Sequence, residues 1–161
     1  SLPMARSAVL AGRIISDTLR NLFVVLLMTL VGLLLGFDVK TSFGGYLGAM
    51  AVTLLLGFSF SWISALIGIS VKNVETAQIA GFIWVFPLVF ASSIFVPIAT
   101  MPDWLQTIAK HSPITAAVDT VRALILGGGF QGQLGNALWW VLAIVAVFMP
   151  WAVRRYRTSG V

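Results

Sequence analysis

Residues 43–71 read FGGYLGAMAVTLLLGFSFSWISALIGISV, an apolar stretch in which no side chain is charged. An α-helix rises about 1.5 Å per residue, so roughly 20 apolar residues cross a hydrocarbon core about 30 Å thick. The stretch is longer than one crossing requires, and we expect the helix to tilt or to extend into the polar interface. It predicts a membrane-spanning helix.

Three further stretches are apolar over a similar length, namely residues 19–37, 77–98 and 134–153. The chain is 59% hydrophobic and only 9% charged, whereas about a quarter of the residues of a soluble domain are charged. The alternative is a soluble protein in which these four helices are buried in the core. It is disfavoured, because the chain would have no polar elements left to cover them. The sequence therefore predicts one all-α domain, a polytopic bundle of four transmembrane helices.

Basic residues are distributed unequally between the two sides of the four predicted spans. The side of both chain ends carries Arg6, Arg13, Arg20, Lys72, Arg154, Arg155 and Arg157, and the other side carries Lys40, Lys110 and Arg122. The positive-inside rule therefore places both ends, with the tail 154–161, in the cytoplasm, where the tail would contact anionic lipid. These bases sit at span ends and form no single face, so nucleic-acid binding is disfavoured.

Small residues recur at a spacing of four in three of the predicted spans. The pairs are Gly32 with Gly36, Gly44 with Gly48, and Ala77 with Gly81. Such pairs let helix backbones approach closely in a membrane, although glycine is also simply common in membrane helices. We interpret the pairs as packing positions.

Residues 1–18 precede the first span, and apolar residues alternate there with Arg6, Arg13 and Asp17. This pattern is typical of an amphipathic helix, and Pro3 is acceptable in its first turn. Such a helix either lies in the headgroup plane or docks onto a partner protein. Composition leaves both possibilities open.

The outer connection over residues 99–133 is too long for an idle loop in a compact membrane domain. Pro97, Pro102 and Pro113 interrupt the region, so we expect short helices over residues 104–110 and 114–126, with a stop at 127–129. The second helix is too polar to span and too apolar for water. We predict a re-entrant helical hairpin in the outer leaflet; the alternative is a cap lying flat on the membrane.

Several side chains of this predicted hairpin have expected structural roles. Asp119 and Arg122, three residues apart on one helix, can pair and are expected to hold the hairpin. Trp104 and Thr115 belong to its two helices, and Ser112 can cap the second helix, which Pro113 begins.

Motifs that carry chemistry are missing from the sequence. The chain contains no cysteine, no G-x-x-x-x-G-K-[ST] loop for ATP, and no H-E-x-x-H or G-x-S-x-G. Its single histidine, His111, has no neighbours at metal-ligand spacing. The central parts of the predicted spans hold no ionisable residue, so a proton-coupled transporter is disfavoured. We expect no catalytic, cofactor or metal site on this chain.

Several segments, in order, resemble type-2 ABC exporter permeases of the daunorubicin-resistance kind. They are SLPMARS at 1–7, Gly12-Arg13, Asp17, GLLLGF at 32–37, FASSIFVP at 90–97, MPDWL at 101–105, SPIT at 112–115 and VRAL at 121–124. The resemblance covers essentially the whole chain, with Ser112 standing where the family commonly has Asn.

The resemblance implies a permease subunit with six spans, of which this chain holds the last four. The chain starts at Ser1 instead of Met, and we expect that residues including two spans precede it. The resemblance implies export of a hydrophobic or amphiphilic solute, such as a drug, antibiotic or lipid-like molecule, across the cytoplasmic membrane of a prokaryote. ATP and Mg would be bound by a separate ATPase subunit, and a second permease subunit would complete the transporter.

The resemblance also implies roles for residues outside the hairpin. Residues 1–18 would end the coupling segment that contacts the ATPase, with the contact made by Leu2, Pro3, Met4, Arg6 and Leu10. Phe82, Phe86 and Phe90 would face the substrate. A non-transporting membrane scaffold, whose amphipathic start binds another cytoplasmic protein, and a membrane-embedded enzyme are the alternatives.

If four helices of this chain lie in hydrocarbon, the chain needs lipid or detergent to remain folded. We expect the chain to stay folded and monodisperse in detergent or lipid and to aggregate in plain buffer, as measured by size-exclusion chromatography and circular dichroism. A folded, monodisperse chain in buffer alone would contradict the membrane assignment.

Overall fold

The computed structural model describes residues 4–36, 41–127 and 131–158, and within these ranges every regular element is helical. The elements are α1 (Met4–Leu34), α2 (Phe43–Ser70), α3 (Val74–Phe90), the 3₁₀ turn η1 (Ile98–Thr100), α4 (Asp103–Lys110), α5 (Pro113–Leu126) and α6 (Gln131–Thr158). The predicted all-α class is confirmed for this part of the chain, and so are the two short helices predicted at 104–110 and 114–126.

Three of the helices are long and apolar enough to cross a membrane: Ala11–Leu34 within α1, Phe43–Ser70, and Gly132–Tyr156 within α6. The third predicted span, residues 77–98, differs, because α3 ends at Phe90 after 17 residues. Pro87 removes an amide donor from the last turn of α3, and the chain then turns at Ala91. A helix of this length covers about 26 Å, at the lower limit for a crossing.

The predicted amphipathic segment and the predicted first span form one helix, so residue 18 marks no boundary. Ile14 is buried, at 3% exposure, in a cluster with Trp62, Ala65, Leu66 and Ala152 of α2 and α6. This part of α1 therefore packs on the bundle. The candidate span within α1 begins at Ala11 and therefore includes Arg13 and Asp17, which precede the predicted span 19–37.

Helix α2 is the centre of the fold and packs against α1, α3, α5 and α6. Two clusters of mostly small buried side chains line it, one around Trp62 near its end and one around Ala49 and Val52 near its start. The second cluster joins α2 to Ala116 and Ala117 of α5 and to α6. Because alanine side chains are short, these helix backbones come close together.

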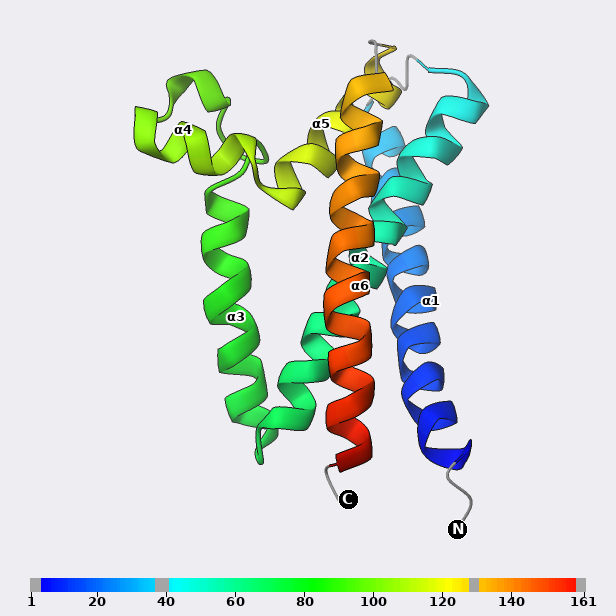
Figure 1. The fold of residues 1–161 in the computed structure, drawn as a ribbon. Helices are drawn as coiled ribbons and strands as arrows, with labels where there is room; N and C mark the ends of the chain where they lie inside the picture. Colours follow the sequence, from blue (N-terminus) through cyan, green and yellow to red (C-terminus); the bar gives the residue numbers. More distant parts are fainter. Residues whose placement is uncertain (1–3, 37–40, 128–130, 159–161) are drawn as a thin grey trace.

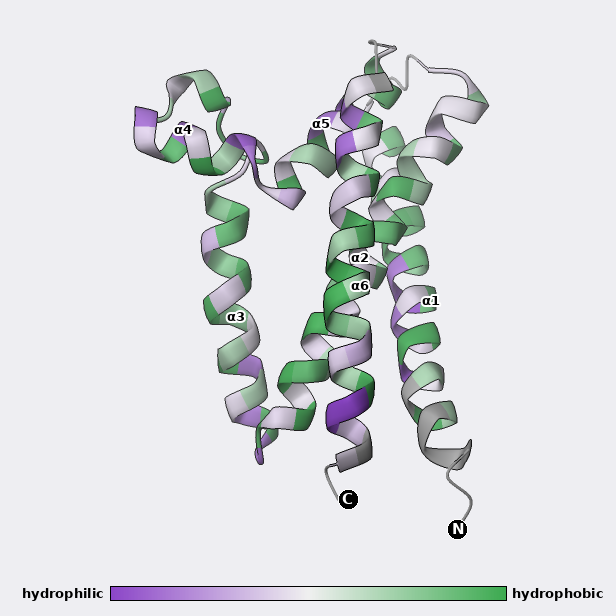
Figure 2. Ribbon diagram, viewed as in Figure 1, coloured by the Kyte–Doolittle hydropathy of each residue, from purple (hydrophilic) through white to green (hydrophobic). Residues whose placement is uncertain are grey.

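The helix ends sort into two groups (Figure 1). The start of α1, the turn between α2 and α3, and the end of α6 lie at one end of the bundle, and α4 and α5 lie at the other. Hydrophobic residues cover the long helices, and hydrophilic residues gather near helix ends, on part of α1 and on α5 (Figure 2). The start of α1 and the end of α6 therefore lie at the same end of the helical bundle.

Glycine positions show where helices touch most closely. A Cβ atom built on Gly45 would lie 3.1 Å from the carbonyl oxygen of Leu124 in α5 and would overlap the Thr41 hydroxyl. Of the predicted packing glycines, Gly48 also contacts Leu124, whereas a Cβ on Gly36 or Gly81 would meet nothing within 4 Å among the described residues. The closest approach of a glycine to the backbone of another helix is therefore at Gly45, outside the predicted pairs.

Gly45→Ala should destabilise the contact of α2 with α5. We expect an unfolding free energy lower by about 1–3 kcal/mol, because a backbone carbonyl cannot move aside easily, measured from unfolding in detergent by circular dichroism. Gly44→Ala is the matched control, since its Cβ would meet only the Ser42 hydroxyl, at 3.8 Å. The control should be neutral or stabilising by up to about 1 kcal/mol, and equal losses in both variants would contradict the close approach.

Candidate functional site

Ser93, just after α3, is held by three side chains of α5. The Ser93 amide donates to Thr115 Oγ1 at 3.2 Å, and the Ser93 hydroxyl donates to Asp119 Oδ1 at 2.8 Å. Arg122 Nη2 donates to the Ser93 carbonyl at 3.1 Å, and its Nη1 lies 3.4 Å from Asp119 Oδ1. We call Ser93, Thr115, Asp119 and Arg122 the Ser93 clamp.

In the clamp, the amide, the carbonyl and the hydroxyl of Ser93 all have hydrogen-bond partners, and all three partners lie on α5. Thr115, Asp119 and Arg122 follow at intervals of four and three, so they lie along one face of α5. Ser93 and Thr115 are buried at 5% and 3% exposure. Since α3 packs mainly against α2, these bonds add a second attachment, which joins the end of α3 to α5.

The other residues predicted for the hairpin lie at element boundaries or on its surface. Pro97 precedes η1, Pro102 precedes α4, and Pro113 is the first residue of α5. Trp104 is 68% exposed on α4. Helix α5 ends at Gly127, whose left-handed φ of 78° is the predicted glycine stop; residues 128–130 lie outside the described ranges.

Phe82, Phe86 and Phe90 form a ladder along one face of α3 that continues to Phe95. Successive ring centroids are 5.2, 4.3 and 5.5 Å apart. The first three rings are 66%, 46% and 56% exposed. The three phenylalanines that were predicted to face the substrate therefore lie side by side. The cavity beside α3 is lined by other residues of this region, Trp84, Leu88 and Ala91.

The predicted coupling residues lie at the beginning of α1. Met4, Arg6 and Leu10 belong to this helix, and Leu2 and Pro3 fall outside the described residues. The helix continues from Met4 to Leu34, so one unbroken helix joins the predicted ATPase contact to the opposite end of the bundle.

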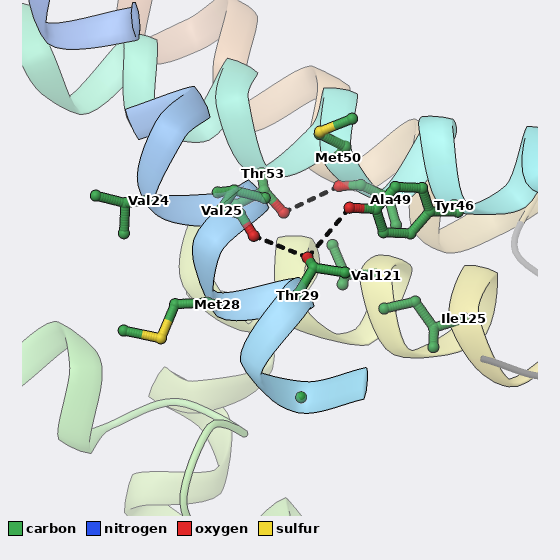
Figure 3. A pocket seen from close by; sticks show the side chains of 11 residues that line it. Val24, Val25, Met28, Thr29, Tyr46, Ala49, Met50, Thr53, Val121 and Ile125 are labelled. Atoms are coloured by element: carbon green, nitrogen blue, oxygen red, sulfur yellow. Dashed lines mark hydrogen bonds between the residues drawn. The ribbon is translucent and has the colours of Figure 1, made fainter. Parts of the chain in front are cut away.

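At the opposite end, α1 meets α2 and α5 around a cavity of 330 Å³, which we call the Tyr46 cavity (Figure 3). Tyr46 donates to Thr29 Oγ1 at 3.1 Å, and Thr29 donates to the Val25 carbonyl at 2.8 Å. Thr53 donates to the Ala49 carbonyl at 2.9 Å. These polar groups are therefore engaged within the protein, and the rest of the wall is apolar.

A larger cavity of 590 Å³, which we call the Trp84 cavity, lies where α2, α3, α4, α5 and α6 meet. Its walls are almost entirely apolar and include four aromatic rings. The residues that line it are Phe60, Ile63, Trp84, Leu88, Ala91, Ile108, His111, Ser112, Pro113, Trp140, Ile144 and Phe148.

Two side-chain polar atoms of residues that line the Trp84 cavity have no hydrogen-bond partner among the described residues. They are Trp84 Nε1 and Ser112 Oγ, both buried. Ser112 occupies the N-cap position of α5, yet its hydroxyl makes no cap bond, which corrects the predicted capping role. Its carbonyl accepts the first amide bond of the helix instead, at 3.1 Å from the Ala116 nitrogen.

A polar cavity of 400 Å³, which we call the Asp17 cavity, lies between α1 and α2 and shares Phe60 with the Trp84 cavity. Asp17, Arg20 and Asn21 line it from α1, and Ser61 and Ser64 line it from α2. Within the described ranges no group of three or more His, Asp or Glu side chains could hold a metal ion.

Sequence reasoning named three members of the Ser93 clamp and missed the fourth. Ser93 is a small hydroxyl residue in an apolar stretch, and nothing local distinguishes it from Ser92. Trp84 and Ser112 were also missed as cavity residues. Their importance depends on which hydroxyls and indoles lack a partner, and only the packed structure decides that.

Comparisons with known proteins give the family context. A family model described as ABC-2 type transporter matches residues 1–126. The chain is 38% identical, over 99% of its length, to the daunorubicin resistance ABC transporter permease protein DrrB1 of Streptomyces coeruleorubidus. It is 27% identical, over 98% of its length, to the probable doxorubicin resistance ABC transporter permease protein DrrC of Mycobacterium tuberculosis. The chain spans 56% and 57% of the length of these relatives, and no solved structure matches it.

Ser93→Ala should weaken the attachment of α3 to α5. We expect a loss of about 1–2 kcal/mol in unfolding free energy, because the variant removes a charge-assisted bond and Asp119 is partly hydrated. Ser92→Ala is the control, since Ser92 is as buried but its hydroxyl donates to the Val89 carbonyl and accepts from the Ile94 amide, and so makes no bond to α5. Thermal unfolding in detergent measures both, and an equal effect would contradict a specific clamp.

Proposed function

Because the chain belongs to the ABC-2 type transporter family, we propose that it forms the last four transmembrane segments of the permease subunit of an ABC exporter. The observation that carries the proposal is the family match over residues 1–126, which covers α1 to α5. In this proposal the chain conducts the solute, and a separate subunit binds ATP and Mg and supplies the energy. A second permease subunit completes the transporter.

Helix α1 supports a direct mechanical link between the ATPase and the far side of the membrane. It contains 31 residues without interruption, which corresponds to about 46 Å. A displacement of Arg6 by the ATPase would move α1 as a rigid rod. The Tyr46–Thr29 bond and the packing of Ile14 would pass that displacement to α2, the helix that all the other long helices contact.

The orientation follows from charge. We place the start of α1, the turn between α2 and α3, and the end of α6 in the cytoplasm, because most basic residues lie there. Helices α4 and α5 then face outward as the re-entrant hairpin. The Ser93 clamp fixes α5 to α3, so α5 and the outer end of α3 move together.

The solute is proposed to be hydrophobic or amphiphilic. The two relatives are named for resistance to daunorubicin and doxorubicin, and the walls of the Tyr46 and Trp84 cavities are mostly apolar. Export from the cytoplasm would confer such resistance.

Transport can be tested with inverted membrane vesicles that contain the complete permease and its ATPase. We expect ATP-dependent uptake of daunorubicin, measured by its fluorescence, and no uptake with a non-hydrolysable ATP analogue. Absence of transport, together with stable binding of a different cytoplasmic protein, would favour the membrane scaffold.

Arg6→Glu should uncouple the two subunits. We expect at least about tenfold weaker association with the ATPase subunit, measured by co-purification and by stimulation of ATP hydrolysis, because charge complementarity at a docking surface is reversed. Arg154→Glu makes the same charge change on α6 at the same end of the bundle and should keep the association. Equal losses would show that net charge, and not the coupling segment, controls docking.

A further inference from the structure

Two four-residue segments of the chain, DTLR at residues 17–20 and DTVR at residues 119–122, are nearly identical. In each segment the carboxylate and the guanidinium stand three residues apart on one helix, a spacing at which they can pair. The second segment forms an ion pair, with 3.4 Å between Nη1 of its arginine and Oδ1 of its aspartate. Within the described ranges, the side chains of Asp17 and Arg20 form no ion pair and no hydrogen bond. The first segment therefore keeps two opposite charges without a partner in this part of the chain.

Asp17 and Arg20 line the Asp17 cavity, a volume of 400 Å³ between α1 and α2. Asn21 also lines it and reaches α2, because a Cβ atom built on Gly57 would lie 3.0 Å from Asn21 Nδ2. The Asn21 amide group and the Ser64 hydroxyl on the α2 wall likewise make no hydrogen bond within the described ranges. The cavity thus offers a carboxylate, a guanidinium and two neutral donors to a ligand.

These polar groups of the Asp17 cavity can be reached from outside. Asp17 and Asn21 are half-buried, and Arg20 and Ser64 are exposed. In the Trp84 cavity, by contrast, the unpartnered indole and hydroxyl atoms are fully buried. The hydroxyls of the Tyr46 cavity have protein partners. Of these three cavities, the Asp17 cavity is therefore the one that presents charged groups to a ligand.

The Asp17 cavity lies close to one surface of the membrane. Both helices that form it are long and apolar enough to cross a bilayer. Asp17 lies about 9 Å along α1 from Ala11, where the candidate span begins. Ser64 lies about 9 Å along α2 from the end of that helix at Ser70. Because the hydrocarbon core is about 30 Å thick, this depth is near the headgroups and not at the bilayer centre.

We propose that the Asp17 cavity binds the headgroup of a phospholipid with a primary ammonium group, such as phosphatidylethanolamine. Arg20, Asn21 and Ser64 donate to the phosphate oxygens, and the Asp17 carboxylate accepts from the ammonium group. One positive and one negative charge of the protein then meet one negative and one positive charge of the lipid. The cavity volume falls within the range usual for small-molecule sites. The inference requires only that the chain lies in a membrane and is independent of the transport proposal.

Other ligands match the Asp17 cavity less completely. An anionic lipid such as phosphatidylglycerol brings a phosphate but no cation, so Asp17 would lie unpaired beside a second negative charge, which is costly near hydrocarbon. Phosphatidylcholine carries a cation without N–H donors, so it cannot hydrogen-bond to the carboxylate. A soluble phosphoethanolamine compound has the same polar groups, but it lacks the acyl chains that would hold it at this depth.

The test compares phosphatidylethanolamine with phosphatidylcholine of identical acyl chains. The complete permease, in detergent and without ATPase or nucleotide, is titrated with each lipid, and native mass spectrometry gives the dissociation constant of the first bound lipid. We expect phosphatidylethanolamine to bind about three- to tenfold more tightly, the effect of a hydrogen bond to a charged group that is partly hydrated.

Two substitutions should change binding in different ways. Asp17→Asn should remove the preference, so that the two lipids bind within about twofold of each other, because the amide keeps the shape but loses the charge. Glu75→Gln is its control, since Glu75 is an exposed carboxylate at the start of α3, at the same end of the bundle, and does not line the cavity.

Arg20→Gln should weaken both lipids about three- to tenfold and leave their ratio unchanged, because both carry the phosphate. Arg13→Gln is the matched control, since Arg13 is exposed on the same helix and does not line the cavity. Circular dichroism should show the same helix content in all four variants, because none of the four side chains has an ion-pair or hydrogen-bond partner within the described ranges.

Four results would overturn the inference. The unsubstituted protein could bind the two lipids equally, or each cavity variant could behave like its control. Soluble glycerophosphoethanolamine could displace the lipid at equal concentration, which would show a site for a free phosphate compound. The complete permease could also bind no lipid. Transport of daunorubicin in vesicles tests the proposed function separately, since it can succeed or fail whichever lipid is bound.

Discussion

Hydrocarbon offers no hydrogen-bond partner, so each polar group of a membrane helix must find one within the protein. The helices of this chain meet that constraint locally. Hydroxyls donate to the carbonyl four residues earlier on the same helix, as in Ser16 to Gly12, Thr18 to Ile14, Thr29 to Val25, Thr53 to Ala49, Ser61 to Gly57, Ser70 to Leu66 and Thr120 to Ala116. Such bonds satisfy the hydroxyl without involving another helix. The Ser93 clamp and the Trp84 cavity are departures from this pattern.

The first departure is Ser93, whose hydroxyl leaves its own segment and binds Asp119 of α5. Its amide and carbonyl also bond to α5. The short turn after α3 is therefore attached to α5 through three groups of one residue. Helix α3 otherwise packs mainly against α2, so the Ser93 clamp is its second attachment to the described helices.

The second departure is Ser112, whose hydroxyl has no partner among the described residues. It lies at the start of α5, one residue before the proline that begins the helix. The clamp and the Trp84 cavity therefore occur along the same helix, the cavity at its start and the clamp extending to Arg122. A displacement of α5 would therefore change both.

The sequence by itself determined the class of the protein, since charge-free apolar stretches can be stable only as membrane helices, and a glycine stop and proline breaks are local properties of the chain. It also named Asp119 and Arg122, because residues three apart share a helix face, and Thr115 as a residue of the predicted hairpin. Tertiary structure decided the rest: that α1 is unbroken, that α3 ends at Phe90, that Gly45 lies against the backbone of α5, and that Ser93 and Ser112 differ from the similar serines nearby. These facts depend on which atoms of distant segments meet, and no pattern within a single helix records that.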